Sequence, residues 1–416
     1  MTDWTRRDLL KLGVAAPAAA SAMFSADSAA LAESIENSAQ QSTAAQTAPA
    51  NILPGRERLL LDFGWRFHLG DADDAKKDFD FGAASSFSKS GRLFAASRAN
   101  FDDSQWREVD LPHDWAVELP FDDGSQLPPD ERRDHISHGC KPLGRAYAAT
   151  SIGWYRRVFE IPANDAGRRL SLEFDGVYRD AIVAFNGHYI GRNFSGYAPA
   201  RYDVSDFVNF GAKNYLVVRV DATENEGWFY EGAGIYRHVW LVKTHPIHVA
   251  DGGAFASCDV RGDRAIVTTI VEIENESDAP QSCAISFAIQ DDSGGVRAGA
   301  ESTPATVPAW SRKEIRHELT VLNPKLWSLE TPVLYKLVTT IESGGKEIER
   351  HETPFGIRTI RFDANEGFFL NGKRVPIRGT CNHQDHAGVG AALPDRLQAY
   401  RIERLKEMGC NAYRTS

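Results

Sequence analysis

Alternation of apolar and polar residues along most of the chain is the feature that most constrains its fold. From Arg58 to about Lys243, and again from about His245 to Glu352, hydrophobic side chains recur at every second position. A strand with one buried face has this period of two, whereas a helix repeats about every 3.6 residues. No long helical stripe interrupts either region. The pattern therefore predicts two β-sandwich domains, the second of immunoglobulin-like size.

The clearest local signal is a hairpin in the first region. The apolar run 181–185 is followed by Asn186-Gly187 and then by residues 188–190. Asn-Gly tolerates the positive φ angles of a tight two-residue turn, so these segments are expected to pair as antiparallel strands.

Composition excludes several classes of protein. The chain has 416 residues, of which 42% are hydrophobic and 25% charged, as in globular proteins. Its net charge of -10 argues against nucleic acid or an anionic membrane as a partner. The five cysteines are widely spaced and form no CxxC pair, so neither a disulfide framework nor a zinc module is expected. They are Cys140, Cys258, Cys283, Cys381 and Cys410.

The N-terminus has the features of an export signal. Arg6-Arg7 precede an apolar stretch over 12–24, which is too short to span a bilayer, and Ala30-Leu31-Ala32 offers a cleavage site. The arginine pair resembles the twin-arginine type; the alternative is a chance basic pair before a buried helix. We expect 1–32 to be this signal and 33–54 a flexible leader. The mature protein would then be periplasmic or secreted, with no membrane segment.

The C-terminal end of the sequence changes in character. Residues 368–370 and 375–377 are expected to form short strands, 395–408 a helix and 411–414 another strand. Strand, helix, strand is the order of a βα unit. Because residues 356–416 amount to about a quarter of the ~250 residues of a (β/α)8 barrel, we expect only the beginning of such a barrel.

The expected helix has recognisable ends. Asp395 would be its N-terminal cap and Gly409 its terminator. Its inward face would consist of Leu397, Ile402, Leu405 and Met408.

A polar cluster, Asn382-His-Gln-Asp-His386, follows the first expected barrel strand. Barrel enzymes place their active-site groups at this end of the strands. Two histidines and an aspartate in five residues could ligate a metal, hydrogen-bond a polyol, or lie in a surface loop, and the spacing alone leaves all three open. A neutral imidazole both donates and accepts hydrogen bonds, which suits a polyol.

Eight segments carry a family resemblance when they are taken in order. They are Leu111–Trp115, Gly153–Arg156, Phe174–Tyr178, Gly232–Trp240, Asn323–Trp327, Phe355–Arg358, Leu370–His386 and Asn411–Ser416. Together they resemble glycoside hydrolase family 2, the group of β-galactosidases, β-glucuronidases and β-mannosidases. The resemblance implies a sugar-binding-like jelly roll at 55–244, an immunoglobulin-like sandwich at 245–355, and the first βα units of an incomplete TIM barrel at 356–416.

The resemblance also implies an activity. It predicts an exported, retaining exo-β-glycosidase for terminal β-hexosides whose two catalytic glutamates lie on later barrel strands, beyond Ser416, so that this chain alone is expected to be inactive. Residues 382–390 look like those of β-galactosidase-type members and lack the Asn-Lys motif that glucuronidases use for a uronate. β-Galactosides are therefore the first choice. The alternatives are a β-glucuronidase, a subunit whose barrel is a second polypeptide, or a non-catalytic carbohydrate-binding sandwich protein.

No cofactor is expected. Mg²⁺ or Na⁺ occurs in some similar enzymes, but the sequence shows no carboxylate cluster that requires either. The partner would be a carbohydrate substrate, and the complete enzyme could be a homo-oligomer.

Similar enzymes suggest roles for residues of the expected barrel. His386 would contact sugar hydroxyls near the scissile bond, while Asn382 and His383 belong to the same motif, with His383 in a more structural role. Arg414 would lie beneath the nucleophile and keep it ionised, unless it forms an ordinary salt bridge in the barrel. Asn411 would support the same strand end.

Loops of the first sandwich would complete the sugar site. In similar enzymes the matching loops close over the barrel mouth, where aromatic faces can stack on a sugar and carboxylates can accept hydrogen bonds from its hydroxyl groups. The alternative is that the aromatic side chains belong to the sandwich core. The candidates are Asp114, Trp228, Tyr230 and Glu231.

Overall fold

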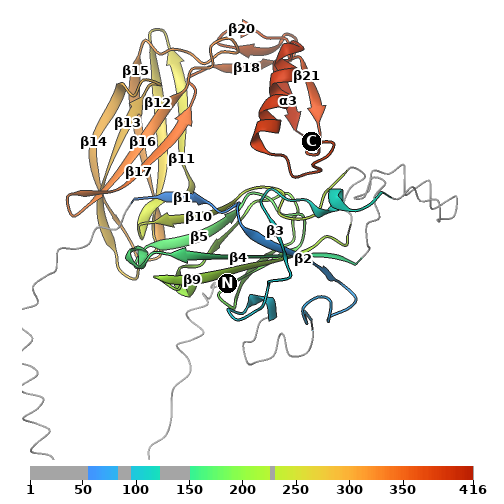
Figure 1. The fold of residues 1–416 in the computed structure, drawn as a ribbon. Coiled ribbons are helices and arrows are strands. Elements are labelled where there is room, and N and C mark those ends of the chain that lie inside the picture. Colours follow the sequence, from blue (N-terminus) through green and yellow to red (C-terminus); the bar gives the residue numbers. More distant parts are fainter. Residues whose placement is uncertain (1–54, 83–94, 122–149, 225–229, 416) are drawn as a thin grey trace, which may run out of the picture. The chain divides into compact units, whose positions relative to one another are not determined.

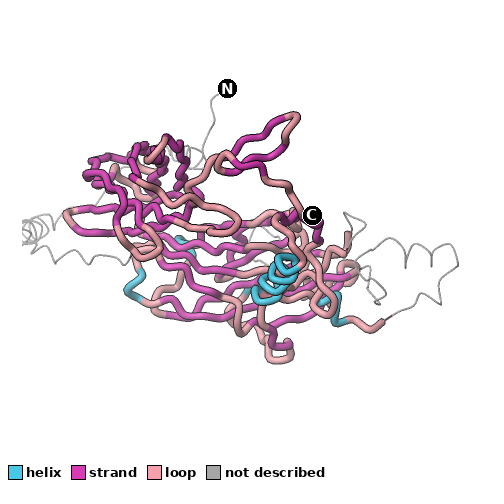
Figure 2. Tube along the Cα trace, turned by 90° about the horizontal axis from the view of Figure 1, so that it is seen from above, coloured by secondary structure: helices cyan, strands magenta, loops and turns pink. Residues whose placement is uncertain are grey.

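The computed structural model describes residues 55–82, 95–121, 150–224 and 230–415. Strands predominate over these ranges, and one long helix stands out from them (Figure 2). The prediction of a mainly β protein is confirmed. The expected export signal and leader lie outside the described residues, as does Trp228.

The first sandwich consists of two antiparallel sheets (Figure 1). One has six strands in the order β3-β2-β4-β9-β6-β7, and the other has four in the order β1-β10-β5-β8. The strands are β1 Glu57–Leu60, β2 Trp65–Asp71, β3 Arg107–Val109, β4 Ser151–Ile161, β5 Arg169–Phe174, β6 Ala181–Phe185, β7 His188–Asn193, β8 Ala200–Asp203, β9 Ala212–Asp221 and β10 Val239–Thr244.

Alternation places the main core of this sandwich between its two sheets. Tyr155 of β4 and Val218 of β9 meet Leu172 and Phe174 of β5 there, all of them buried. The intervening strand residues point to the other face of the six-stranded sheet and form a smaller cluster there. Trp154, which precedes Tyr155 in the chain, belongs to this cluster. The larger sheet is therefore covered on both faces, which accounts for its many fully buried strand residues.

The hairpin predicted from Asn186-Gly187 is confirmed. Strands β6 and β7 pair in antiparallel register around this turn, and both turn residues have positive φ angles, 50° and 82°. The side-chain amide of Asn186 also donates to the Phe207 carbonyl and to Oδ1 of Asn214, at 2.7 and 2.8 Å. The turn is thus fixed by its backbone preference and by its neighbours.

The second sandwich has the seven strands of an immunoglobulin-like domain (Figure 1). Its sheets have the orders β11-β12-β15 and β14-β13-β16-β17. The alternation that predicted them is seen directly in β12 and β13, where every second residue is buried in the shared core. The strands are β11 Ile247–Arg261, β12 Arg264–Asn275, β13 Gln281–Gln290, β14 Val296–Val307, β15 Ser311–Leu322, β16 Tyr335–Ser343 and β17 Lys346–Phe355.

The C-terminal residues form a small sheet and one β-α-β unit. Strands β18 Ile360–Asp363, β19 Gly367–Leu370 and β20 Lys373–Arg374 make the sheet. Helix α3, Asp395–Glu407, then connects β21 Gly379–Asn382 to β22 Ala412–Thr415, and these two strands pair in parallel. The predicted strand-helix-strand order is confirmed, and the described residues contain no closed barrel.

One predicted strand is misplaced. The expected strand at 375–377 is instead β20, two residues earlier. The Val375 N–H still donates to the Phe368 carbonyl at 2.9 Å. Pro376 has no N–H with which to continue the ladder, so the pairing stops there.

Two expectations for the helix are also corrected. Pro394 occupies the cap position, and Asp395 is the first helical residue. Gly409 does end the helix, with φ +87°. Of the expected inward face, Leu397 and Leu405 are half-buried, but Ile402 is 49% and Met408 69% exposed. An amphipathic pattern identifies the apolar face of a helix, whereas burial of that face also requires a partner, and the described residues supply little that covers it.

Buried His248 of β11 makes the stability of the fold dependent on pH. Burial, reinforced by the positive charges of Arg56 and Arg201, lowers the pKa of His248 to about 3. The unfolded chain takes up this proton below about pH 6.5, so stability is lost as pH falls below that value. When the pH is lowered from 7.5 to 5.5, the free energy of unfolding should fall in both proteins. The fall should be about 1.4 kcal/mol larger in wild type than in His248→Gln.

Urea unfolding at the two pH values measures this difference, with His188→Gln on exposed β7 as the matched control. A His248→Gln variant with the full wild-type pH dependence would show that the buried imidazole does not contribute.

Candidate functional site

The polar loop 383–391 begins directly after β21 and closes on itself. The His386 N–H donates to the Gly390 carbonyl at 2.9 Å, and the Gly390 N–H returns a bond to the His386 carbonyl at 3.0 Å. Gly390 has φ +59°, in the region that favours glycine. These paired bonds fix His386 relative to the end of the loop.

A buried aspartate of the first sandwich holds this loop. Asp114 precedes a short 3₁₀ turn, η3 Trp115–Glu118, and is 2% exposed. Its Oδ1 accepts from the N–H groups of Ala116 and Ala233, both at 3.0 Å. Its Oδ2 accepts from the Tyr230 hydroxyl at 2.7 Å and from the Ala391 N–H at 2.9 Å. Four donors from three separate segments therefore meet on one carboxylate.

Small residues allow this close approach. A Cβ on Gly390 would lie 2.3 Å from Oδ2 of Asp114 and 2.6 Å from the Tyr230 hydroxyl. A Cβ on Gly232 would lie 2.7 Å from the Ala391 methyl group. Ala391 itself is fully buried and belongs to the core of the first sandwich. The end of the loop is thus part of that core.

The electrostatics of Asp114 follow from its burial. Loss of water raises the pKa of the Asp114 carboxyl, and the hydrogen bonds from Ala391, Tyr230, Ala116 and Ala233 act in the opposite direction. Three of these donors are backbone N–H groups, which cannot accept a hydrogen bond. Both carboxylate oxygens of Asp114 must therefore act as acceptors.

Two further contacts join the C-terminal segment to the first sandwich. The Gln384 side-chain amide donates to the Tyr230 carbonyl at 2.9 Å. His238 lies between two carboxylates, with Nδ1 2.5 Å from Asp62 and Nε2 3.2 Å from Asp395 at the start of α3. Sequence reasoning missed both contacts, and it also missed Gly390 and Ala391, because the partners are more than 150 positions apart in the chain.

The structure places Asn382 at the end of β21, and His383 and His386 in the loop that follows. Asn382 ends β21, and its side-chain amide donates to the Thr380 hydroxyl at 2.8 Å. His383 is exposed, and its carbonyl accepts from Arg401 at 2.9 Å. His386 is half-buried, with Nδ1 3.0 Å from the Ala387 carbonyl. The polar side chains at this strand end are therefore the imidazoles of His383 and His386, the half-buried carboxyl group of Asp385 and the amide of Asn382.

Asp114, Tyr230 and Glu231 are brought to this loop but lie in the protein interior. Tyr230 is buried with its hydroxyl on Asp114, and Glu231 is 1% exposed. In this structure Asp114 has both oxygens directed at protein donors. The predicted sugar contacts of these residues stay predictions, and the fourth, Trp228, lies outside the described residues.

Asn411 and Arg414 lie at different ends of the parallel strand pair. Asn411 precedes β22, at the N-terminal end, where its side chain accepts from the Arg378 N–H at 2.8 Å and donates to the Pro376 carbonyl at 3.0 Å. This end is opposite the one that carries His386, so the position of Asn411 is that of a strand support. Arg414 lies beside Cys381 on β21, with Nη1 3.2 Å from its Sγ.

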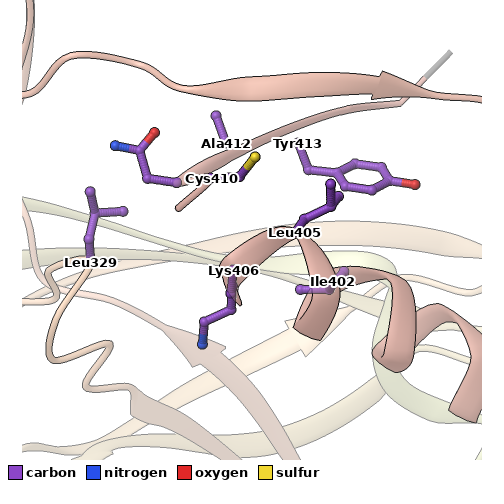
Figure 3. A pocket seen from close by; sticks show the side chains of 8 residues that line it. Leu329, Ile402, Leu405, Lys406, Cys410, Ala412 and Tyr413 are labelled. Carbon is purple, nitrogen blue, oxygen red and sulfur yellow. The ribbon is translucent and has the colours of Figure 1, made fainter. Parts of the chain in front are cut away.

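An apolar hollow of about 260 Å³ lies between α3 and the start of β22 (Figure 3). Ile402 and Leu405 of the helix and Tyr413 of β22 face it, together with Leu329. Apart from Asn411, no predicted sugar contact lines it. The hollow therefore belongs to the uncovered apolar face of the helix and not to the polar strand end.

In the part of the chain that the structure describes, no group of three or more His, Cys, Asp or Glu side chains is arranged to hold a metal ion. Nor is any described helix both long and apolar enough to cross a membrane.

Two β-sandwiches leading into a β-α-β unit, with a polar strand-end loop held by the first sandwich, have the arrangement of a multidomain glycosidase. The model "Glycosyl hydrolases family 2, sugar binding domain" matches residues 61–245, and "Glycosyl hydrolases family 2" matches 247–358. The chain belongs to glycosyl hydrolase family 2.

Relatives named as glycosidases support the same assignment. The chain is 37% identical over 372 residues to the β-galactosidase BoGH2A of Bacteroides ovatus, covering 88% of this chain and 39% of that protein. It is 30% identical over 323 residues to a β-glucuronidase of Bacteroides fragilis, covering 74% of this chain and 43% of that one. The chain thus spans less than half the length of these relatives.

Solved structures share the fold. A family 2 glycosyl hydrolase from Bacteroides cellulosilyticus is 31% identical with a TM-score of 0.70, over 86% of this chain and 44% of that one. Bacteroides uniformis β-glucuronidase 2 is 26% identical with a TM-score of 0.69, over 86% of this chain and 39% of that one.

The position of His238 between Asp62 and Asp395 makes this contact dependent on pH. Burial would lower the pKa of His238, but its hydrogen bonds to Asp62 and Asp395 outweigh that effect and raise the pKa above its ordinary value. The stabilisation is then fully present below about pH 6.5 and is lost as pH rises through the higher folded-state pKa. His238→Gln should cost about 1.5 kcal/mol at pH 6 and clearly less at pH 9.

Chemical unfolding of both proteins at the two pH values measures this cost. Asp395→Asn is the control, because the Asp395 side chain is 86% exposed and its ion pair should contribute less than about 0.5 kcal/mol. An equal cost of His238→Gln at pH 6 and pH 9 would contradict the prediction.

Proposed function

We propose that this chain forms the N-terminal domains and the first barrel strands of an exported, retaining exo-β-glycosidase that acts on terminal β-galactosides. The observation that carries the proposal is the 383–391 loop, which lies at the C-terminal end of a parallel strand and rests on the sandwich that matches the family's sugar binding domain. Barrel enzymes build their active sites at this end of their strands.

The choice of sugar rests on the relatives and on the loop sequence. The relative at 37% identity is named a β-galactosidase, and those at 32% and 30% a putative β-glucuronidase and a β-glucuronidase. The 382–390 segment resembles that of β-galactosidase-type members. A β-glucuronidase of the same family is the second candidate. A carbohydrate-binding protein without catalysis is a third, and the β-α-β unit argues against it because a binding module has no need of one.

In the proposed reaction the strand-end loop orients the sugar. The imidazole of His386 is half-buried and presented on a closed turn. Because its Nδ1 donates to the Ala387 carbonyl, Nε2 of the neutral ring can accept from a sugar hydroxyl. Arg414 would hold a nucleophilic carboxylate ionised from below. Retention requires two carboxyl groups about 5 Å apart, and we assign these to glutamates on strands later than β22.

A covalent mechanism has support from one relative. Bacteroides uniformis β-glucuronidase 2 has been solved covalently bound to a cyclophellitol-6-carboxylate aziridine. A protein side chain that bonds to a sugar analogue is what a retaining enzyme requires, because such an enzyme forms a glycosyl-enzyme intermediate. We propose the same route for the protein to which this chain contributes.

The sugar contact at His386 can be tested in the full-length enzyme. Loss of one positioned hydrogen-bonding group costs about 2–4 kcal/mol of transition-state stabilisation. His386→Ala should therefore lower kcat/KM for nitrophenyl β-galactoside at least thirtyfold, with His188→Ala on β7 as the control. The 416-residue chain alone should release no nitrophenol.

The result also decides between the candidate functions. A change below about threefold on His386→Ala would contradict the sugar contact, and a preference for nitrophenyl β-glucuronide would replace the galactosidase by the second candidate. Sugar binding without turnover by the full-length protein would favour the third.

Export through the twin-arginine route is a separate part of the proposal. It rests on Arg6-Arg7 ahead of the apolar stretch and on Ala30-Leu31-Ala32. Replacing both arginines by lysine should leave the precursor in the cytosol, because this route reads the arginine pair. Cell fractionation and immunoblotting measure the outcome, and export at the wild-type level would contradict it.

A further inference from the structure

We propose that Asp114 is the positioning residue for His386: its carboxylate fastens the end of the 383–391 loop to the first sandwich and so fixes where the imidazole is presented. The importance of His386 to sugar binding rests on the function proposed above. The fastening itself rests only on the contacts of Asp114.

The two oxygens of Asp114 have separate tasks. Oδ1 accepts from Ala116 and Ala233, both in the first sandwich, and so completes the local structure around η3. Oδ2 accepts from Ala391 of the loop and from the Tyr230 hydroxyl. Binding of the loop is therefore assigned to one oxygen of the carboxylate, and the local fold to the other.

The contact reaches His386 through the backbone. Ala391 follows Gly390, and Gly390 exchanges two backbone hydrogen bonds with His386. A Cβ on Gly390 would have no room against Asp114, so the absence of a side chain there allows the loop end to approach the carboxylate. When the Ala391 N–H is held on Oδ2, the residue that pairs with His386 is held as well.

An aspartate is required here, and an asparagine would separate the two tasks. Asparagine offers one acceptor oxygen and one NH₂ group. Ala116 and Ala233 both present N–H groups that only donate, so the side-chain oxygen should remain on their side. The NH₂ group would then face Tyr230, whose hydroxyl can turn to accept, and Ala391, whose N–H cannot. Asp114→Asn should therefore release Ala391 alone.

All three backbone donors are alanines, which makes the experiment selective. The chain is labelled with ¹⁵N-alanine, and hydrogen exchange of the Ala116, Ala233 and Ala391 amides is followed by NMR in wild type and Asp114→Asn. We expect exchange at Ala391 to become at least about tenfold faster, as loss of a buried charged acceptor implies. Exchange at Ala116 and Ala233 should change less than about threefold.

A pH series adds a readout that a general loss of packing would not produce. In wild type the Ala391 resonance should move with pH as Asp114 is protonated, and in Asp114→Asn it should not. Tyr230→Phe is the matched control, because it removes a donor from Oδ2 and leaves the acceptor for Ala391 in place. It should keep exchange at Ala391 within about threefold of wild type.

A second variant approaches the contact from the loop. Gly390→Ala inserts a methyl group against Oδ2 and should accelerate exchange at Ala391 while Ala116 and Ala233 stay protected, so the proposal remains testable if Asp114→Asn does not fold. Equal acceleration at all three amides, or none at Ala391, would overturn it. If the loop is released as expected but His386→Ala leaves glycoside turnover unchanged, the fastening stands and the proposed sugar contact fails.

Discussion

A carboxylate inside a protein is stable only where donors replace the water that it has lost, and Asp114 satisfies that condition with four. The donors come from η3, from the 230–233 segment and from the end of the strand loop, so none of these segments can move away without leaving the charge unsatisfied. Removal of one partner from a buried charged hydrogen bond typically costs more than the bond contributes. This single side chain thus links the core of the first sandwich to the polar strand end.

The parts of the fold that the sequence predicted are those governed by local periodicity. Residues 181–190 form the expected hairpin because an apolar run and an Asn-Gly turn lie within ten positions of each other. Strands such as β12 and β13 of the second sandwich follow from a period of two, since burial of one sheet face selects every second side chain. The strand-helix-strand order at the C-terminus is predicted for a similar reason, and Gly409 ends the helix as its position suggests.

The parts that the sequence did not predict depend on distant partners. The hydrogen bonds of Asp114 to Tyr230, Ala233 and Ala391 are of this kind, since Ala391 is 277 positions away, while the predicted sugar contact of Asp114 stays a prediction. Backbone N–H groups belong to every residue except proline, so no residue type marks them as donors to a carboxylate. The exposure of Ile402 and Met408 has the same origin, because the helical pattern identifies a face without identifying what packs against it.

Fastening the loop through main-chain groups has a consequence for recognition. Asp114 binds the N–H groups of Ala233 and Ala391, and Gly390 contributes only its lack of a side chain. Among the side chains of the loop, Gln384 donates a hydrogen bond to the Tyr230 carbonyl, while the imidazole of His383 is exposed. A loop held by its backbone can keep its position while its side chains are changed. The position of the strand-end loop is therefore set by its backbone, and substitutions at 383 or 386 should alter the proposed sugar recognition without disturbing the carboxylate that holds the loop.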